Sequence, residues 1–378
     1  MNRDFSASLY LGIKHSSGEL RAWDSLTTGA PAAFFEPPAA VALGKSIARL
    51  QGLADGVVAP STLHLFWDWF GGLDPRKDVV FADAQLYRIG TWGVERAIGK
   101  GIPAAKFRHQ CAASLQRLVR QNLGRRQRPI VVTDGWCPFC GKAAPLLDYL
   151  RIVEPFDGLL VVDDTQALGI FGKKPDMLMP YGYGGGGLLR HLNISSERVL
   201  AISSLAKAFG APLAAMCGSV FEIQKFKMRS ETRVNASPPS AAALAAGRNA
   251  LRRNTDSGTD RREKLFQNVL FFQKIMAESG FETKGGFFPV QTILGLDGKE
   301  TRRVHAALWE TGIRTVPVLA HGKNPKLCWL LNALHSRRDI EKASQAFFSI
   351  ATRQTAPFLK RYNHENPARR NFIARNIG

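Results

Sequence analysis

The sequence predicts an α/β fold with a mainly parallel sheet in a large domain and a smaller α+β domain at the C-terminal side. Short apolar runs typical of buried strands recur at 79–84, 130–135, 158–164, 198–204 and 213–219. Between most of them lie helical patterns, for example over 111–123 and 144–153. Strands that alternate with helices indicate a parallel sheet, whose functional residues gather at the carboxyl ends of the strands.

These runs divide the chain into four parts. Residues 1–60 form an N-terminal segment rich in Pro, Ala and Gly, with a helix expected near 37–52. Residues 61–250 form the large domain. Residues 251–355 form the small domain, in which the pattern predicts strands over 290–296, 313–320 and 326–334 and helices over 301–312 and 339–350. Residues 356–378 are a basic tail.

Composition narrows the class of protein. The 378 residues are 45% hydrophobic and 22% charged, which is typical of a soluble globular protein. No apolar run is long enough to span a membrane, and the first residues lack the apolar core of a signal peptide, so we expect a cytoplasmic protein. The five cysteines are few and odd in number, which argues against a disulfide framework, and no cysteine or histidine spacing predicts a metal site. The net charge of +20 favours phosphate-bearing partners, but no nucleic-acid motif is present.

Two strand ends carry residues that are candidates for a catalytic or binding role. Asp163 ends an apolar strand, where a carboxylate is costly unless it meets a cation or hydrogen-bond donors. Lys207 follows the next strand and its two serines, Ser203 and Ser204. Burial lowers the pKa of a lysine and frees its amine for Schiff-base chemistry. The plainer alternatives are an aspartate that caps a turn and a lysine on a surface loop.

Together the two motifs, VDDTQALGIFG and SSLAKAFGAPLAAMCGS, resemble the fold-type I pyridoxal-phosphate-dependent enzymes of the α-oxoamine synthase branch. The resemblance covers about residues 40–350 and implies a seven-stranded sheet and pyridoxal 5'-phosphate as the cofactor. It implies that Lys207 is the Schiff-base lysine and that Asp163 pairs with the pyridine nitrogen, which makes the ring an electron sink. Gln166 stands where the branch has a histidine and can donate a hydrogen bond but cannot act as an acid or a base. Ser204, and more weakly Ser203, match a hydroxyl near the cofactor.

Two other segments extend this resemblance. Tyr87 falls on a histidine that stacks on the pyridine ring, and Asp134, in VVTDGWCPFC, falls on a glutamate. The segment VNASPPSAAALAA resembles one whose hydroxyl reaches the phosphate of the neighbouring subunit's cofactor, which makes Asn235 and Ser237 candidates. The resemblance therefore implies a homodimer, with residues 1–60 packing on the dimer or on the small domain.

Three features depart from the branch. The connection over 71–78 is too short for the turn that usually holds the phosphate, so either it forms a shorter cup or phosphate binding is weakened or supplied from elsewhere, and Ser61 and His64 are expected nearby. The arginine that binds the substrate carboxylate is missing, since Lys326 and Cys328 occupy the two matching places. The run Gly184–Gly187 is expected to form a flexible loop near the active-site mouth or a surface turn.

The resemblance implies condensation of a small amino substrate with an acyl thioester, from coenzyme A or an acyl carrier, through a Lys207 Schiff base. Three alternatives remain open at this stage. One is a pyridoxal-phosphate-dependent aminotransferase, and another is a non-catalytic binding subunit that keeps the fold. The third is a glutaredoxin-like oxidoreductase, suggested by Cys137 and Cys140 and by RTVPVLA over 314–320, although these segments lie far apart in the chain.

Overall fold

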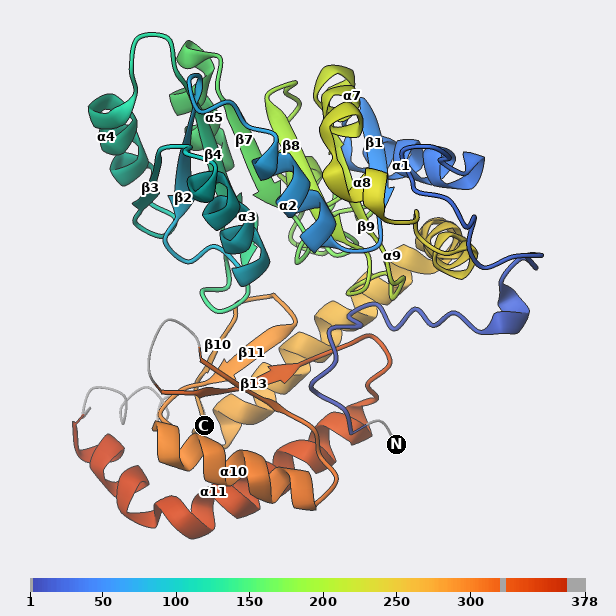
Figure 1. The fold of residues 1–378 in the computed structure, drawn as a ribbon. Helices are drawn as coiled ribbons and strands as arrows, with labels where there is room; N and C mark the ends of the chain where they lie inside the picture. Colours follow the sequence, from blue (N-terminus) through green and yellow to red (C-terminus); the bar gives the residue numbers. More distant parts are fainter. Residues whose placement is uncertain (1–2, 320–323, 366–378) are drawn as a thin grey trace.

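The structure is a computed structural model that describes residues 3–319 and 324–365, with side chains described up to residue 351 (Figure 1). It confirms the predicted large domain with a seven-stranded sheet, in the order β1-β9-β8-β7-β4-β2-β3. The strands of this sheet are β1 (Asp55–Ala59), β2 (Asp78–Asp83), β3 (Ala104–Phe107), β4 (Arg128–Asp134), β7 (Leu159–Asp163), β8 (Val199–Ser204) and β9 (Ala214–Gly218). Only β9 runs against its neighbours within this sheet, so the sheet is mainly parallel as predicted.

Helices cover both faces of the sheet, which is why its central strands are apolar at every position rather than at alternate ones. Val57, Val80 and Val161 pack on one face, and Val58, Val79 and Val162 pack on the other. The first face carries α2 (Thr62–Gly71), α3 (Arg88–Gly99) and α7 (Val220–Arg229), and the short helix α8 (Glu231–Asn235) packs on α2. The second carries α1 (Pro38–Gln51), α4 (Ala112–Asn122), α5 (Leu146–Val153), α6 (Leu188–His191) and the first half of α9 (Ala241–Glu278).

The small domain is built on the far half of α9 (Figure 1). Its four-stranded antiparallel sheet has the order β10-β11-β13-β12. The elements are β10 (Thr283–Lys284), β11 (Val290–Ile293), α10 (Gly298–Glu310), β12 (Val316–Val318), β13 (Lys326–Leu330) and α11 (Arg337–Glu365). Because α9 and α11 are continuous helices, the predicted domain boundaries at 250 and 355 fall inside helices. Residues 366–378 of the predicted tail lie outside the described part of the chain.

The N-terminal segment also contacts the small domain. The N–H of Phe5 donates to the carbonyl of Arg314 at 2.8 Å, and the N–H of Leu330 donates to the carbonyl of Phe5 at 2.9 Å. The Phe5 ring lies between Trp329 and His335, with ring centroids 5.0 and 4.2 Å away. The segment continues through the short helical turn η1 (Ser17–Glu19) and then reaches α1. None of the described helices is long and apolar enough to span a bilayer.

The glycine run corrects the prediction made for it. Gly185, Gly186 and Gly187 are buried, so neither a flexible loop nor a surface turn describes them. The carbonyl of Gly184 accepts from Asn254, and the N–H of Gly187 donates to the carbonyl of Phe171 at 2.8 Å. All four glycines except Gly186 have positive φ angles, which a residue with a Cβ adopts only with strain. Gly185, Gly186 and Gly187 therefore serve close packing, whereas Gly184 is exposed.

Candidate active site

The carboxyl ends of four neighbouring strands meet at one edge of the large sheet. Asp83, Asp134, Asp163 and Ser204 end β2, β4, β7 and β8, and Asp134 lies directly beside Asp163 in the register of the sheet. A cavity of about 180 Å³ opens at this edge. Six of the nine predicted site residues line it: Lys207, Asp163, Gln166, Tyr87, Ser204 and Asp134.

Lys207 projects into this cavity from the turn after β8. Its Nζ lies 5.8 Å from the centre of the Tyr87 ring. Burial lowers the pKa of Lys207, although the nearby carboxylates of Asp163 and Asp134 partly oppose that shift. A lysine in such surroundings gives up its proton more readily than one in water. Its amine is therefore suited to attack a carbonyl or to accept a proton.

Asp163 is held in a fixed position at the end of β7. Its Oδ1 accepts the backbone N–H of Thr165 at 3.0 Å, and only 7% of the residue is exposed. Burial raises the pKa of Asp163, while hydrogen bonds from Thr165 and the charge of Lys207 act in the opposite direction. The Thr165 Oγ1 also accepts the N–H of Ser204 at 3.0 Å, which ties the ends of β7 and β8 together. Sequence reasoning missed Thr165, although it lies between Asp163 and Gln166 in the same motif.

Asp134 positions the aromatic wall of the cavity. The backbone N–H of Tyr87 donates to both oxygens of the Asp134 carboxylate at 3.2 Å, just before α3 begins. The Tyr87 side chain thereby stays at the mouth, about half exposed. Burial and the neighbouring charge of Asp163 raise the pKa of Asp134 well above its usual range. The two neighbouring carboxyl groups would be stabilised in their ionised form by a cationic or proton-donating ligand.

Gln166 is oriented by the N-terminal segment. The buried Tyr10 hydroxyl donates to the Gln166 Oε1 at 2.9 Å. With its carbonyl oxygen occupied in this way, the carboxamide keeps its NH₂ group as a donor for a ligand. The sequence did not indicate Tyr10, because it lies in a segment far from any motif.

The remaining three predicted residues do not reach the cavity of this chain. Ser203 is fully buried on the other side of β8, where its Oγ accepts from the Gln51 Nε2 at 3.3 Å. Asn235 and Ser237 are exposed at and after the end of α8. Their predicted contact with a phosphate requires a second subunit, which the structure does not contain, so it stays a prediction.

The structure identifies a place for an anion that the sequence left open. Thr62 lines the cavity and is the first residue of α2, so the amino end of this helix faces the cavity. The Ser61 side chain does not cap the helix but contacts the His64 Nδ1 at 2.9 Å. Exposed first-turn N–H groups and the helix dipole favour a phosphate. Residues 71–78 lie at the opposite end of α2 and lead into β2, so the expectation that they form the phosphate turn is wrong.

The two places that match the missing arginine also lie elsewhere. Cys328 is fully buried in the small domain, and its Sγ lies 3.3 Å from the Thr292 Oγ1. The Lys326 Nζ lies 3.5 Å from the carbonyl oxygen of Leu296. In the described part of the chain, Lys207 is therefore the cation that lines the cavity.

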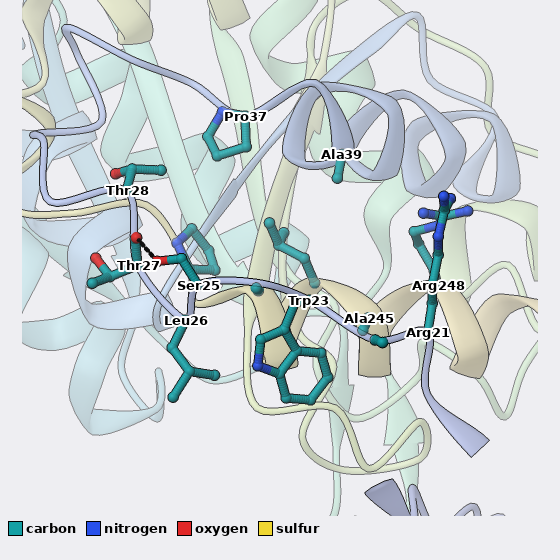
Figure 2. Close-up of a pocket in the computed structure, with 14 residues that line it drawn as sticks. Arg21, Trp23, Ser25, Leu26, Thr27, Thr28, Pro37, Ala39, Ala245 and Arg248 are labelled. Carbon is teal, nitrogen blue, oxygen red and sulfur yellow. Dashed lines mark hydrogen bonds between the residues drawn. The ribbon is translucent and has the colours of Figure 1, made fainter. Parts of the chain in front are cut away.

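A second, larger hollow lies on the α1 side of the large domain (Figure 2). Its volume is about 420 Å³, and it is bounded by the segment 21–28 and the first turns of α1 and α9. Among the described residues that line it, the charged side chains are Arg21 and Arg248. Its lining also holds the hydroxyls of Ser25, Thr27 and Thr28, and no lysine, histidine or carboxylate of the described chain lines it, so it is a poorer candidate for catalysis than the cavity at the strand ends.

Comparison with known proteins gives the family. The family described as aminotransferase class I and II matches residues 75–347. An 8-amino-7-oxononanoate synthase of Citrifermentans bemidjiense is 30% identical over 307 residues, covering 80% of this chain and 75% of that protein. One from Petrotoga mobilis is 28% identical over 249 residues, 65% of this chain but only 60% of that protein's length.

A solved structure supports the fold. Serine palmitoyltransferase of S. paucimobilis with bound PLP–myriocin matches with a TM-score of 0.80 at 14% identity, over 94% of this chain and 88% of that chain. This chain therefore belongs to the aminotransferase class I and II family.

Proposed function

We propose that this protein is a pyridoxal-phosphate-dependent acyltransferase that condenses a small amino substrate with an acyl thioester. The observation that carries the proposal is the position of the Lys207 amine in a cavity whose walls include Asp163, Asp134 and the Tyr87 ring. Curated relatives named 8-amino-7-oxononanoate synthase and a structural neighbour with bound PLP support the same reading.

The residues of the cavity fit this cofactor. Lys207 would hold it covalently, Asp163 would face the ring nitrogen, and Tyr87 would cover one face of the ring. The amino end of α2 and the Ser204 hydroxyl would contact the phosphate or a ring oxygen. When bound, pyridoxal phosphate would supply an electron sink for a carbanion of the amino substrate.

The protein's own groups divide the remaining tasks. Asp163 is buried, and burial raises its pKa, so its ionised form needs a cationic partner, which a protonated ring nitrogen would supply. Lys207 has a lowered pKa and can take the proton from the α-carbon of the amino substrate. Gln166 donates a hydrogen bond but moves no proton.

The partners of this site are part of the proposal. We propose acyl-coenzyme A or an acyl-carrier thioester as the acyl donor, supported by the basic charge of the chain. We also propose a homodimer in which Asn235 and Ser237 complete the partner's phosphate site. A cytoplasmic location is supported by the cysteines, all five of which are free thiols.

The alternative functions are less well supported by the residues of the site. A scaffold subunit has no need for a buried lysine between carboxylates, so the site argues against a non-catalytic relative. A glutaredoxin-like domain is wrong, because Cys137 lies in the large domain whereas the described part of the second segment, residues 314–319, belongs to the small domain. An aminotransferase uses the same residues, and the experiment below separates it from the acyltransferase.

The test is an assay of coenzyme A release. The full chain, supplied with pyridoxal phosphate, is incubated with a panel of acyl-coenzyme A thioesters and amino acids, and the freed thiol is measured. We expect release that depends on both substrates and is absent from Lys207→Ala. Amino-group transfer to a 2-oxo acid with no thiol release would instead establish an aminotransferase and contradict the proposal.

A further inference from the structure

Three potential metal ligands gather beside the cavity. The ligand atoms of His109, Cys137 and Cys140 all lie within 4.8 Å of one another. Cys137 also lines the cavity, together with Pro138 and Phe139. The sequence predicted no metal site, because His109 comes from the segment after β3 and stands at no recognisable spacing from the two cysteines.

The two cysteines lie on a tight hairpin outside the main sheet. Strands β5 (Trp136–Cys137) and β6 (Lys142–Ala143) pair antiparallel, and the turn between them closes with a bond from the Gly141 N–H to the Cys137 carbonyl at 2.9 Å. Gly141 has a φ of +66°, which this turn requires. The backbone N–H of Cys140 donates to the Cys137 Sγ at 3.3 Å, so the hairpin brings a donor to a sulfur that would carry charge as a metal ligand.

His109 presents its second ring nitrogen to this hairpin. Its Nδ1 contacts the Asp83 Oδ1 at 2.8 Å. The Asp83 carboxylate is itself fixed by the backbone N–H groups of Gln85 at 2.8 Å and Gln110 at 2.9 Å. Since an ionised carboxylate only accepts, Nδ1 carries the proton and Nε2 carries the lone pair. A carboxylate behind a histidine is the arrangement that orients and strengthens histidine ligands of metals.

The spacing suits a small tetrahedral ion. With Zn–S near 2.3 Å and Zn–N near 2.05 Å, a tetrahedral S–Zn–N pair has its ligand atoms about 3.6 Å apart. The Cys140 Sγ lies 3.4 Å from the His109 Nε2. Cys137 is within 4.8 Å of both and needs only a small approach. Two sulfurs and one imidazole nitrogen select zinc over the hard ions magnesium and calcium.

We propose that His109, Cys137 and Cys140 bind a zinc ion whose fourth position is open to water or to a ligand in the cavity. Binding releases the two thiol protons to solvent, so that Zn²⁺ meets two thiolates and one neutral imidazole. The ion would join the hairpin to the segment after β3, and it would thereby fix Pro138 and Phe139 as a wall of the cavity. This site does not rest on the proposed acyltransferase function.

The experiment measures the metal directly. The full chain is purified without chelator under reducing conditions, and its zinc is measured by elemental analysis. We expect about one zinc per chain. After chelation, titration with Co²⁺ should give thiolate-to-cobalt charge-transfer absorption together with the visible bands of a tetrahedral ion. This titration uses the unaltered chain, so it stands even if a variant fails to fold.

Variants identify the ligands. Cys137→Ser and Cys140→Ser should each lose the zinc and weaken the cobalt spectrum. Asp83→Asn should keep the spectrum but weaken zinc affinity by about 10- to 100-fold. Cys111→Ser is the matched control, since Cys111 is also a free cysteine and lies two residues after His109. It should bind zinc like the unaltered chain.

Several outcomes would overturn the proposal. Reduced protein that takes up neither zinc nor cobalt would show that Cys140 and His109 only share a hydrogen bond. A Cys137–Cys140 disulfide in the purified chain, with no metal uptake after its reduction, would make the pair a redox site instead. Loss of zinc in Cys111→Ser would contradict the open fourth position. Uptake of pyridoxal phosphate, measured separately by absorbance, reports on the proposed function alone.

Discussion

Lys207 and Asp163 reach the cavity from the ends of two adjacent parallel strands, whereas Cys137 reaches it from a hairpin outside the main sheet that also carries Cys140. A general rule governs the first region, since parallel strands bring their carboxyl ends to one edge. No such rule predicts the hairpin region, because its arrangement depends on the contact between the segment after β3 and the turn that carries Cys140. Residues of the first region can thus be found from short motifs, while those of the second require the folded chain.

The largest expected effect tests the strand-end region. Lys207→Ala removes both the covalent attachment and the proposed base, so kcat should fall by about 10³-fold or more. Coenzyme A release measures this loss, with exposed Lys45→Ala as the control. The zinc content of Lys207→Ala should not change, which would show that the two regions are independent. Retention of full activity would remove Lys207 from the mechanism.

The next largest effect on kcat distinguishes the roles of two neighbouring aspartates. Asp163 faces the cavity, whereas Asp164 faces away, where its carboxylate accepts from the N–H of Leu188 and from the Gln51 side chain, each at 3.2 Å. Asp163→Asn cannot hold a ring nitrogen protonated, and we expect kcat to fall about 100-fold, or roughly 2.7 kcal/mol. Steady-state kinetics of both variants provide the check. If kcat fell strongly in Asp164→Asn but not in Asp163→Asn, Asp163 would not be the catalytic carboxylate.

Asp164 gives a pH dependence of stability. Burial raises its pKa from 3.8 to about 7. Because the pKa in the folded state is raised, the contribution to stability is complete below about pH 4, falls as the pH rises toward 7, and stays lost above it. Between pH 5 and pH 7 this amounts to about 2 kcal/mol of unfolding free energy. Urea denaturation should show a fall that is about 2 kcal/mol larger in the unaltered chain than in Asp164→Asn, which keeps the contributions of Asp134 and Asp163; equal falls in the two proteins would contradict it.

The smallest effect concerns the N-terminal segment. Tyr10→Phe removes the hydroxyl that donates to Gln166, which is worth about 1 kcal/mol, so kcat/KM should fall about fivefold. The control is Tyr181→Phe, since Tyr181 is equally buried but donates to the Phe287 carbonyl away from the cavity. Both variants should lose similar stability, and only Tyr10→Phe should lose activity. An equal loss of activity in both would make the role of Tyr10 purely structural.

Much of the large domain followed from the sequence, because its central strands are continuous apolar runs with helices between them. The edge strands escaped prediction for physical reasons. β3 is largely exposed and carries Lys106, and β1 lies in a segment rich in Pro, Ala and Gly. Ser61 and His64 could be named as neighbours of the phosphate, but because β1 was missed, Thr62 and the amino end of α2 could not be placed at the cavity. Missing β3 hid the position of His109 and hence the neighbour of the two cysteines.

The predicted site residues show the same division. Positions inside the two motifs lie at the cavity, except for Ser203, because alternate residues of a strand face opposite sides of a sheet. Only the structure identifies Thr165 and Tyr10, because their role is to donate hydrogen bonds to two predicted site residues, Asp163 and Gln166. No motif reports such supporting contacts.

Reduction of the bound cofactor tests the central claim most directly. The full chain is loaded with pyridoxal phosphate, treated with borohydride and digested, and the modified peptide is sequenced by mass spectrometry. Our account predicts a phosphopyridoxyl group on Lys207 alone and none on Lys207→Ala. A protein that takes up no cofactor, or one modified at a different lysine, would contradict it.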